Sequence, residues 1–494
     1  MLTTSRRRAL VVQPSELSAL VDYALDQRSL SRQRDLADRV HSELTEWVAF
    51  QTAMIGRRKP DELRVIYLCG PEPMNDLEVL LSLGVNPHNV WAIESNEHIF
   101  RDALESISKA GIPVKLHRGS LKEFFERVHE TFDVAYLDTT GPMLTGRPNS
   151  LAPVLELLRG SRLAPLSVLI TNFAEVPDTE QERYARVMTD FFRFRYNEVP
   201  AALHRAGVDP SIARHDAEHM LAVVRSKLEP VYSDFITRML IDLARDWIPA
   251  ARGFRVLEKQ YLSSDKLTAI ESAFSTEAKG STVSEILANI SSVYLSPETY
   301  PWVSFLRSMR ESAAGEPLIQ QLGNMLFDGR SAEDLNKSVS LLDNITEGHW
   351  QLANKDLLRA IAAPWFDHEL RFSCDIPFPH LIVRSLLGTY GYPAFASLRA
   401  SLRGSYVAKS TRMFTDLLVL DRCRYYFDWF PPAAQVPARF RSHAFQVLAR
   451  CLMDRIWSSD AHSDSHPFKG SSVAGFSALE AAPFPGLKKR ARWR

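Results

Sequence analysis

Polar residues that can do chemistry follow three apolar runs in the first third of the chain. The run at 63–69 is followed by Gly70, the run at 89–95 contains Glu94, and the run at 132–138 ends in Asp138. Carboxylates accept hydrogen bonds from paired donors and can remove a proton from a reacting group. A strand, a glycine turn and a helix commonly build a ligand site at the strand's carboxyl end. The pattern therefore predicts a ligand site where these runs end.

The turn after the first run is poorly suited to one common ligand. The dinucleotide pattern G-x-G-x-x-G is absent, because Pro71, Glu72 and Pro73 follow Gly70. A pyrophosphate needs backbone N–H groups at the helix start, and each proline removes one of them. A nicotinamide dinucleotide is therefore disfavoured. A ligand without phosphate, such as S-adenosylmethionine, does not suffer from this loss.

Alternating elements must position these residues. Five short β-rich runs alternate with four helix-like segments, and the runs lie at 63–69, 89–95, 113–119, 132–138 and 166–173. Consecutive βαβ units with strands this apolar form a parallel sheet that helices cover on both faces. Right-handed crossovers then predict a doubly wound α/β fold. In such a fold the carboxyl ends of neighbouring strands point into one crevice.

Residues 62–177 resemble the Rossmann-type domain of class I S-adenosylmethionine-dependent methyltransferases. Four strand ends in order carry the resemblance, and they read "IYLCGPEP", "VWAIESN", "KLHRGSLKEFF" and "FDVAYLDTTGP". The resemblance implies a Rossmann-like fold, S-adenosylmethionine as the cofactor and methyl transfer as the activity. It covers under a quarter of the chain.

The resemblance also implies roles for individual residues. Glu94 would accept hydrogen bonds from the ribose hydroxyls, and Gly119, Ser120 and Leu121 would contact the adenine. Asp138 would orient the methyl acceptor or take its proton, so it is the predicted catalytic residue. The other predicted cofactor contacts are Cys69, Gly70, Glu72 and Ser95.

Each of these residues also has a purely structural interpretation. Gly70 fits a tight turn without any ligand, Glu94 fits the start of a helix, and Ser120 with Glu123 forms a capping box. Cys69 stands where the family commonly has an acid, and "DTTG" is not the D-P-P-Y or N-P-P-Y of amino-methylating DNA methyltransferases. The alternative function is therefore a noncatalytic Rossmann-like protein that serves as an interaction or sensing module.

The pattern of the chain divides it into five regions. We expect a helical N-terminal segment (1–60), a Rossmann-like S-adenosylmethionine-binding domain (61–180), a helical region (181–365), a mixed aromatic and basic region (366–457) and a disordered tail (458–494). The tail is predicted to be disordered because Ser, Ala, Pro and charged residues dominate it.

Arginine and aromatic residues concentrate between residues 390 and 430. Arg403, Arg412 and Arg424 alternate there with aromatic side chains such as Tyr406 and Phe414. Basic residues beside aromatic platforms hold single-stranded nucleic acid, so nucleic acid is our first candidate for the partner and the methyl acceptor. A small molecule or a protein is the next. The alternative for this segment is an aromatic core whose arginines extend toward solvent.

Composition sets the remaining expectations. The chain of 494 residues carries 59 basic and 59 acidic side chains, so its formal net charge is zero. Overall charge therefore does not indicate a highly charged partner such as nucleic acid. The four cysteines show neither C-x-x-C nor zinc spacing, which favours reduced thiols and a cytoplasmic location. No run is long enough to suggest a membrane span. No metal site is expected, because His215 and His219 lack a third ligand.

Overall fold

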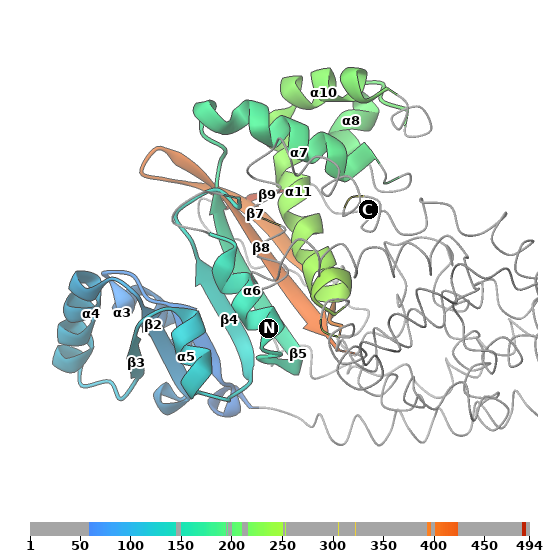
Figure 1. The fold of residues 1–494 in the computed structure, drawn as a ribbon. Helices are drawn as coiled ribbons and strands as arrows, with labels where there is room; N and C mark the ends of the chain where they lie inside the picture. The colour runs from blue at the N-terminus through green and yellow to red at the C-terminus, as the bar shows by residue number, and fades with distance from the viewer. Residues whose placement is uncertain are drawn as a thin grey trace, which may run out of the picture.

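The computed structural model describes two long stretches and several shorter ones (Figure 1). The described residues are 59–144, 150–193, 195, 200–209, 216–249, 252, 305, 322, 393–396, 401–422 and 487–490. The helices expected before residue 59, and most of the regions expected at 181–365 and 458–494, lie outside these residues.

The first half of the described chain alternates strands and helices as the sequence predicts. In chain order it contains η3 (Pro60–Glu62), β1 (Val65–Leu68), α3 (Pro73–Ser82), η4 (Pro87–Asn89), β2 (Val90–Glu94), α4 (Glu97–Ala110), β3 (Lys115–Arg118), α5 (Leu121–Arg127), β4 (Phe132–Asp138), α6 (Ala152–Arg159) and β5 (Leu163–Ala174). These five strands pair in parallel. The predicted α/β class and the parallel arrangement of the five strands are confirmed.

The strand order places a crossover point in the middle of the sheet. The order is β3-β2-β1-β4-β5-β8-β7-β9, so the chain builds outward from β1 to β3 and then returns to the other side of β1 with β4. The direction of winding therefore reverses between β1 and β4. In open α/β sheets, ligands bind outside the carboxyl ends of the strands at such a reversal.

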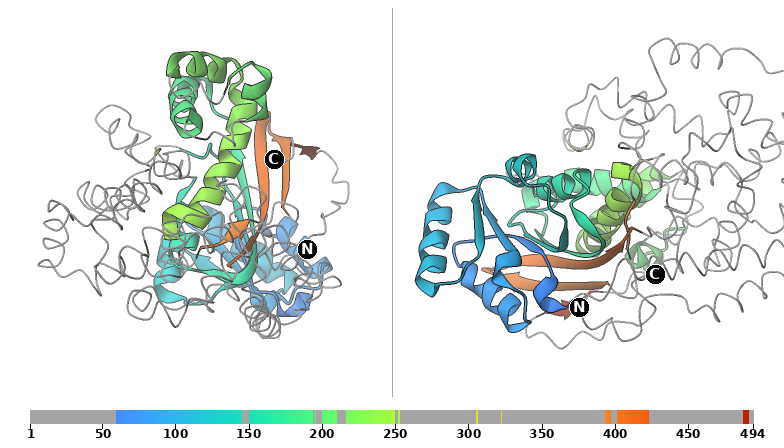
Figure 2. Two further views of the ribbon diagram at one scale, coloured as in Figure 1. Left: turned by 90° about the vertical axis from the view of Figure 1, so that its right-hand side faces the viewer. Right: turned by 90° about the horizontal axis from the view of Figure 1, so that it is seen from below.

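Antiparallel strands from late in the chain complete the sheet. β8 (Thr411–Asp421) pairs with β5 over nine residue pairs, and β7 (Leu402–Ala408) and β6 (Phe395–Ala396) pair with β8. β9 (Lys488–Lys489) pairs with β7. The region expected to be separate from the Rossmann-like domain therefore contributes strands to the same sheet (Figure 2). Residues 488 and 489, within the region expected to be a disordered tail, take part in this sheet.

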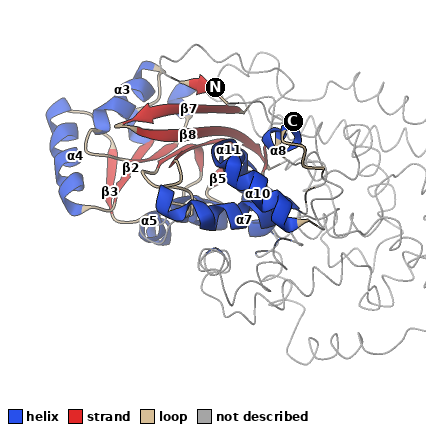
Figure 3. Ribbon diagram, turned by 90° about the horizontal axis from the view of Figure 1, so that it is seen from above, coloured by secondary structure: helices blue, strands red, loops and turns tan. Residues whose placement is uncertain are grey.

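Helices cover both faces of the sheet (Figure 3). On one face α3 and α4 pack through a cluster that includes Tyr67, Leu77 and Ile107. The cluster on the other face includes Phe124 of α5, Leu155 of α6 and Phe235 of α11. The helices after β5 are α7 (Gln181–Arg193), α8 (Ala201–Arg205), α10 (Ala217–Ser226) and α11 (Leu228–Asp242), with η5 (Asp178–Glu180) before them and the π-helical η6 (Leu243–Trp247) after them. Within the described stretches, no helix has the length and apolar character needed to cross a bilayer.

Candidate functional site

The carboxyl ends of the parallel strands bring most of the predicted site residues to one edge of the sheet. The Cys69 N–H donates to the carbonyl of Ile93, and the Gly119 N–H donates to the carbonyl of Glu94. Tyr67 pairs with Tyr136 across β1 and β4, which sets Cys69 and Asp138 at the same level. We call the edge formed by Gly70, Glu94, Gly119, Asp138 and Asn172 the rim.

The turn after β1 leaves space above its backbone. Apart from Gly70 and its two chain neighbours, no heavy atom lies within 4 Å of the position that a Cβ would take on Gly70. Pro73 occupies the first position of α3, where its missing N–H costs nothing. The exposed Glu72 accepts a hydrogen bond of 2.9 Å from Asn75 Nδ2. Cys69 is buried, and burial with the nearby Glu94 charge raises the pKa of its thiol to about 12, so it is no nucleophile at neutral pH.

Glu94 is half-buried at the end of β2. Its Oε1 accepts a hydrogen bond of 2.6 Å from the backbone N–H of Asn96, which is the N-cap of α4. Burial raises the pKa of Glu94, and the backbone N–H groups of Asn96 and Ser95 oppose that rise. Ser95 itself is exposed. One carboxylate oxygen of Glu94 is thus used at the start of α4.

The third strand end contributes backbone rather than side chains to the rim. Gly119 has a φ of +141°, and a Cβ there would lie 2.7 Å from Glu123 Oε2, so glycine is required. The Ser120 hydroxyl accepts from the Glu123 N–H at 3.2 Å while Glu123 Oε2 accepts from the Ser120 N–H at 2.7 Å. Leu121 is buried in the core. The structural interpretation of Ser120 as a helix cap is therefore correct.

Asp138 is exposed at the end of β4 and is held from one side. Its Oδ1 accepts a hydrogen bond of 2.9 Å from Nδ2 of the buried Asn172 on β5. The same nitrogen donates to the Tyr136 hydroxyl at 3.1 Å, and Asn172 Oδ1 accepts from Thr415 Oγ1 at 2.7 Å. The late strand β8 therefore helps to orient the predicted catalytic carboxylate.

Sequence reasoning missed a second carboxylate at this place. Asp76 lies in the first turn of α3, and burial together with the charge of Asp138 raises its pKa to about 6. Burial and the same two acids also raise the pKa of Tyr406 on β7 to about 12. The pKa values of the buried Tyr67 and the half-buried Tyr136 are also raised, mainly by burial. The signal in the sequence is an acid one turn after the glycine turn, on the helix rather than at a strand end.

The carboxyl groups of Asp76 and Asp138 interact with each other. Within the described part of the chain, burial and Asp138 are what move the pKa of Asp76, and no basic group offsets them. A carboxyl group whose pKa is raised to about 6 can give up or take a proton near neutral pH. Neutral phenols beside the two acids supply hydrogen bonds without adding charge at neutral pH. The arrangement therefore suits proton transfer with a neutral or cationic group.

Where it is described, the predicted arginine and aromatic segment is partly buried in the fold and partly at its surface. Arg403 is 7% exposed and lies 2.9 Å from Asp234, and Arg412 is paired with Glu229. Phe414 belongs to the core. The alternative interpretation as an aromatic core fits these residues, whereas Arg399, Arg424 and the aromatic residues after 422 lie outside the described stretches.

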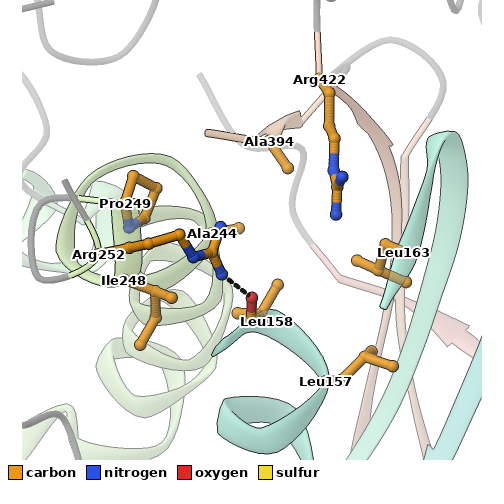
Figure 4. A pocket seen from close by; sticks show the side chains of 9 residues that line it. All are labelled: Leu157, Leu158, Leu163, Ala244, Ile248, Pro249, Arg252, Ala394 and Arg422. Carbon is orange, nitrogen blue, oxygen red and sulfur yellow. Dashed lines mark hydrogen bonds between the residues drawn. The ribbon is translucent and has the colours of Figure 1, made fainter. Parts of the chain in front are cut away.

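A pocket lies at the opposite end of β5 from the rim (Figure 4). It encloses about 260 Å³ of empty space, open solvent included, between Leu163, Ile248 and Ala394. Arg252 lines it, but its guanidinium donates to the carbonyls of Leu158 and Arg159 at 2.6 and 2.7 Å. This arginine therefore caps the carboxyl end of α6, and the pocket has no part in the predicted site.

Neither a metal site nor a known relative identifies the function of the rim. Among the described residues, no three side chains of His, Cys, Asp or Glu are grouped so as to hold a metal ion. His219 lies in the first turn of α10, and His215 is outside the described residues. No protein-family model matches the chain, and no curated protein matches it by sequence.

Proposed function

We propose that the chain is an S-adenosylmethionine-dependent methyltransferase whose reaction takes place at the rim. The observation that carries the proposal is the meeting of Gly70, Glu94 and Asp138 at the reversal of strand order. Ligands of open α/β sheets bind at this place. The open space above Gly70 lets a ligand approach the backbone closely.

The residues of the rim fit this cofactor better than a dinucleotide. Pro71 and Pro73 withhold two N–H groups from a pyrophosphate, and S-adenosylmethionine has none. Glu94 would accept from the ribose hydroxyls with the oxygen that does not bind Asn96. The backbone of Gly119, Ser120 and Leu121 would border the adenine. Cys69, Gly70, Glu72 and Ser95 would line the rest of the cofactor.

Asp138 of the rim and Asp76 of α3 would bind the methyl acceptor and take its proton. When bound, S-adenosylmethionine supplies an electrophilic methyl group on a cationic sulfonium. An acceptor nitrogen or oxygen that gains this methyl group loses a proton, and Asp138 or Asp76 would take it. Asn172 would keep Asp138 in position. Since Asp76 and Asp138 repel a polyanion, we propose a neutral or cationic acceptor ahead of nucleic acid.

Titration calorimetry with S-adenosylhomocysteine tests the proposal. We expect binding, and Glu94→Ala should weaken it by about 1.5–3 kcal/mol, the range for a hydrogen bond to a charged group. Glu105→Ala is the matched control, because Glu105 lies on α4 and pairs only with Lys109 at the surface. An affinity unchanged by Glu94→Ala would remove the ribose contact from the proposal.

A noncatalytic interaction or sensing protein is the second candidate. The observation that favours it is the use of Glu94 and Ser120 at helix starts, where both satisfy backbone groups without any ligand. Absence of binding at millimolar S-adenosylhomocysteine by the folded wild type would favour this function over the methyltransferase.

A further inference from the structure

The last described residues of the chain add a strand to the free edge of β7. Lys489 pairs with Gly404 and Lys488 pairs with Ser405, both antiparallel. The Arg490 N–H extends this pairing by donating to the Arg403 carbonyl at 3.2 Å. We call residues 487–490 the C-terminal strand. A strand this short buries little apolar surface, so its attachment needs another source of free energy.

Arg490 provides that attachment in a pocket between β8 and α11. Its side chain is 5% exposed, and Nη1 donates to Asp416 Oδ2 at 2.7 Å and to the Thr415 carbonyl at 3.1 Å. Nε donates to Ser233 Oγ at 2.6 Å, and Nη2 donates to the Ser233 carbonyl and to Thr237 Oγ1. The guanidinium also lies 5.3 Å from the centre of the Phe414 ring.

The geometry of this pocket is selective for a guanidinium. Every N–H-bearing atom of the Arg490 head has an acceptor, and the acceptors come from two different elements. Lysine carries a single ammonium point charge and cannot reach these directions together. The buried Asp416 also receives a hydrogen bond of 2.5 Å from Thr237 and lies 3.6 Å from Arg403 Nε, so it is firmly held. We call these groups the Asp416 pocket.

A second contact fixes the strand over the sheet. A Cβ on Gly404 would lie 2.6 Å from Leu487 Cδ1, so Leu487 covers the place where a side chain would stand. Gly404 pairs with Thr415, which bonds to Asn172 of the rim. Tyr406 lies two residues along β7 on the same face, and burial together with the charges of Asp138 and Asp76 raises its pKa. The C-terminal strand is thus attached to β7, which pairs through Gly404 with the strand that contacts Asn172 of the rim.

We propose that the β7 edge and the Asp416 pocket form a recognition site for an extended peptide that presents an arginine, and that the chain's own C-terminal strand is its reversible occupant. The Lys488 and Lys489 side chains are exposed and contribute little to recognition. Release of the strand uncovers the edge of β7. This inference does not depend on methyl transfer.

Hydrogen exchange in the full-length chain tests the proposal. Arg490→Lys should raise amide exchange in 402–408 and 487–490 by at least about tenfold, because local opening sets exchange at an edge strand. Lys489→Ala is the control, and it should leave both segments within about twofold of the wild type. Unchanged protection in Arg490→Lys would overturn the role of the guanidinium.

Competition tests reversibility. A synthetic peptide with the sequence LKKRARWR, at millimolar concentration, should displace the C-terminal strand and raise exchange at 487–490 while keeping 402–408 protected. The same peptide with lysine in place of Arg490 should do neither. If the native peptide leaves exchange at 487–490 unchanged, the strand is a permanent part of the sheet and the proposal is wrong.

Discussion

Asp76→Asn should stabilise the protein at neutral pH, although it removes a charge from the first turn of a helix. Burial and Asp138 raise the pKa of Asp76 from 3.8 to about 6. Because the folded state binds this proton more tightly than the unfolded state, the stability linked to Asp76 is full below about pH 4. It is lost as the pH rises toward 6. Asparagine does not titrate, so the variant escapes this loss.

The size of the effect follows from the pKa. A rise of about two pKa units corresponds to about 3 kcal/mol at 1.36 kcal/mol each. Asp76 keeps some contact with solvent, which screens the charge and reduces the figure to about 1–2 kcal/mol. Losing an acid near the start of α3 costs about 0.5 kcal/mol. We therefore expect a net gain of about 1 kcal/mol at pH 7.5 and no gain at pH 4.

Urea unfolding of wild type and Asp76→Asn at several pH values measures this difference. Asp102→Asn is the control, because Asp102 is exposed on α4 and should give no pH-dependent gain. In the Asp138→Asn background the gain should shrink, since one cause of the raised pKa is gone. A variant less stable than the wild type at pH 7.5, or an equal gain from Asp102→Asn, would refute the reasoning.

Two further predictions concern Asp138 of the rim and Ser120 at the start of α5. Asp138→Asn should leave the affinity for S-adenosylhomocysteine within a few-fold of the wild type. If Asp138 takes the proton, the same variant should lower the rate of methyl transfer to a verified acceptor by about 10²–10⁴. An unchanged rate would exclude that role. Ser120→Ala should lower the unfolding free energy by about 1 kcal/mol through loss of the capping box. Thermal unfolding checks it, with Ser120→Thr as the control that retains most of the cap, and equal losses in both variants would contradict the assignment.

The parallel half of the sheet was predictable because its signals are local. Each apolar run, glycine turn and capping residue lies within a few residues of the element that it defines, as Asn96 and Ser120 illustrate. The rim follows from this order, since parallel strands share an edge at their carboxyl ends. That is why Glu94 and Asp138 could be placed from the sequence.

The antiparallel part of the sheet, the buried ion pairs and the pKa of Asp76 depend on contacts between distant segments. The apolar residues of 411–421 indicate a strand, but nothing local says that β5 is its partner. Arginines look alike in a sequence whether they face solvent or a buried acid, so the pairing of Arg403 with Asp234 could not be predicted. Asp76 likewise owes its raised pKa to a residue on another strand.

The pairing of β5 with β8 has a consequence for the making of the protein. Asn172 and Thr415, which meet across these strands, are 243 residues apart in the chain. At about 5–20 residues per second, synthesis of the intervening chain takes roughly 10–50 s. Throughout that time the nascent β5 presents an apolar edge with no β8 to pair with, and such edges recruit other chains. A newly made molecule therefore carries an unpaired edge on β5 until β8 has been translated.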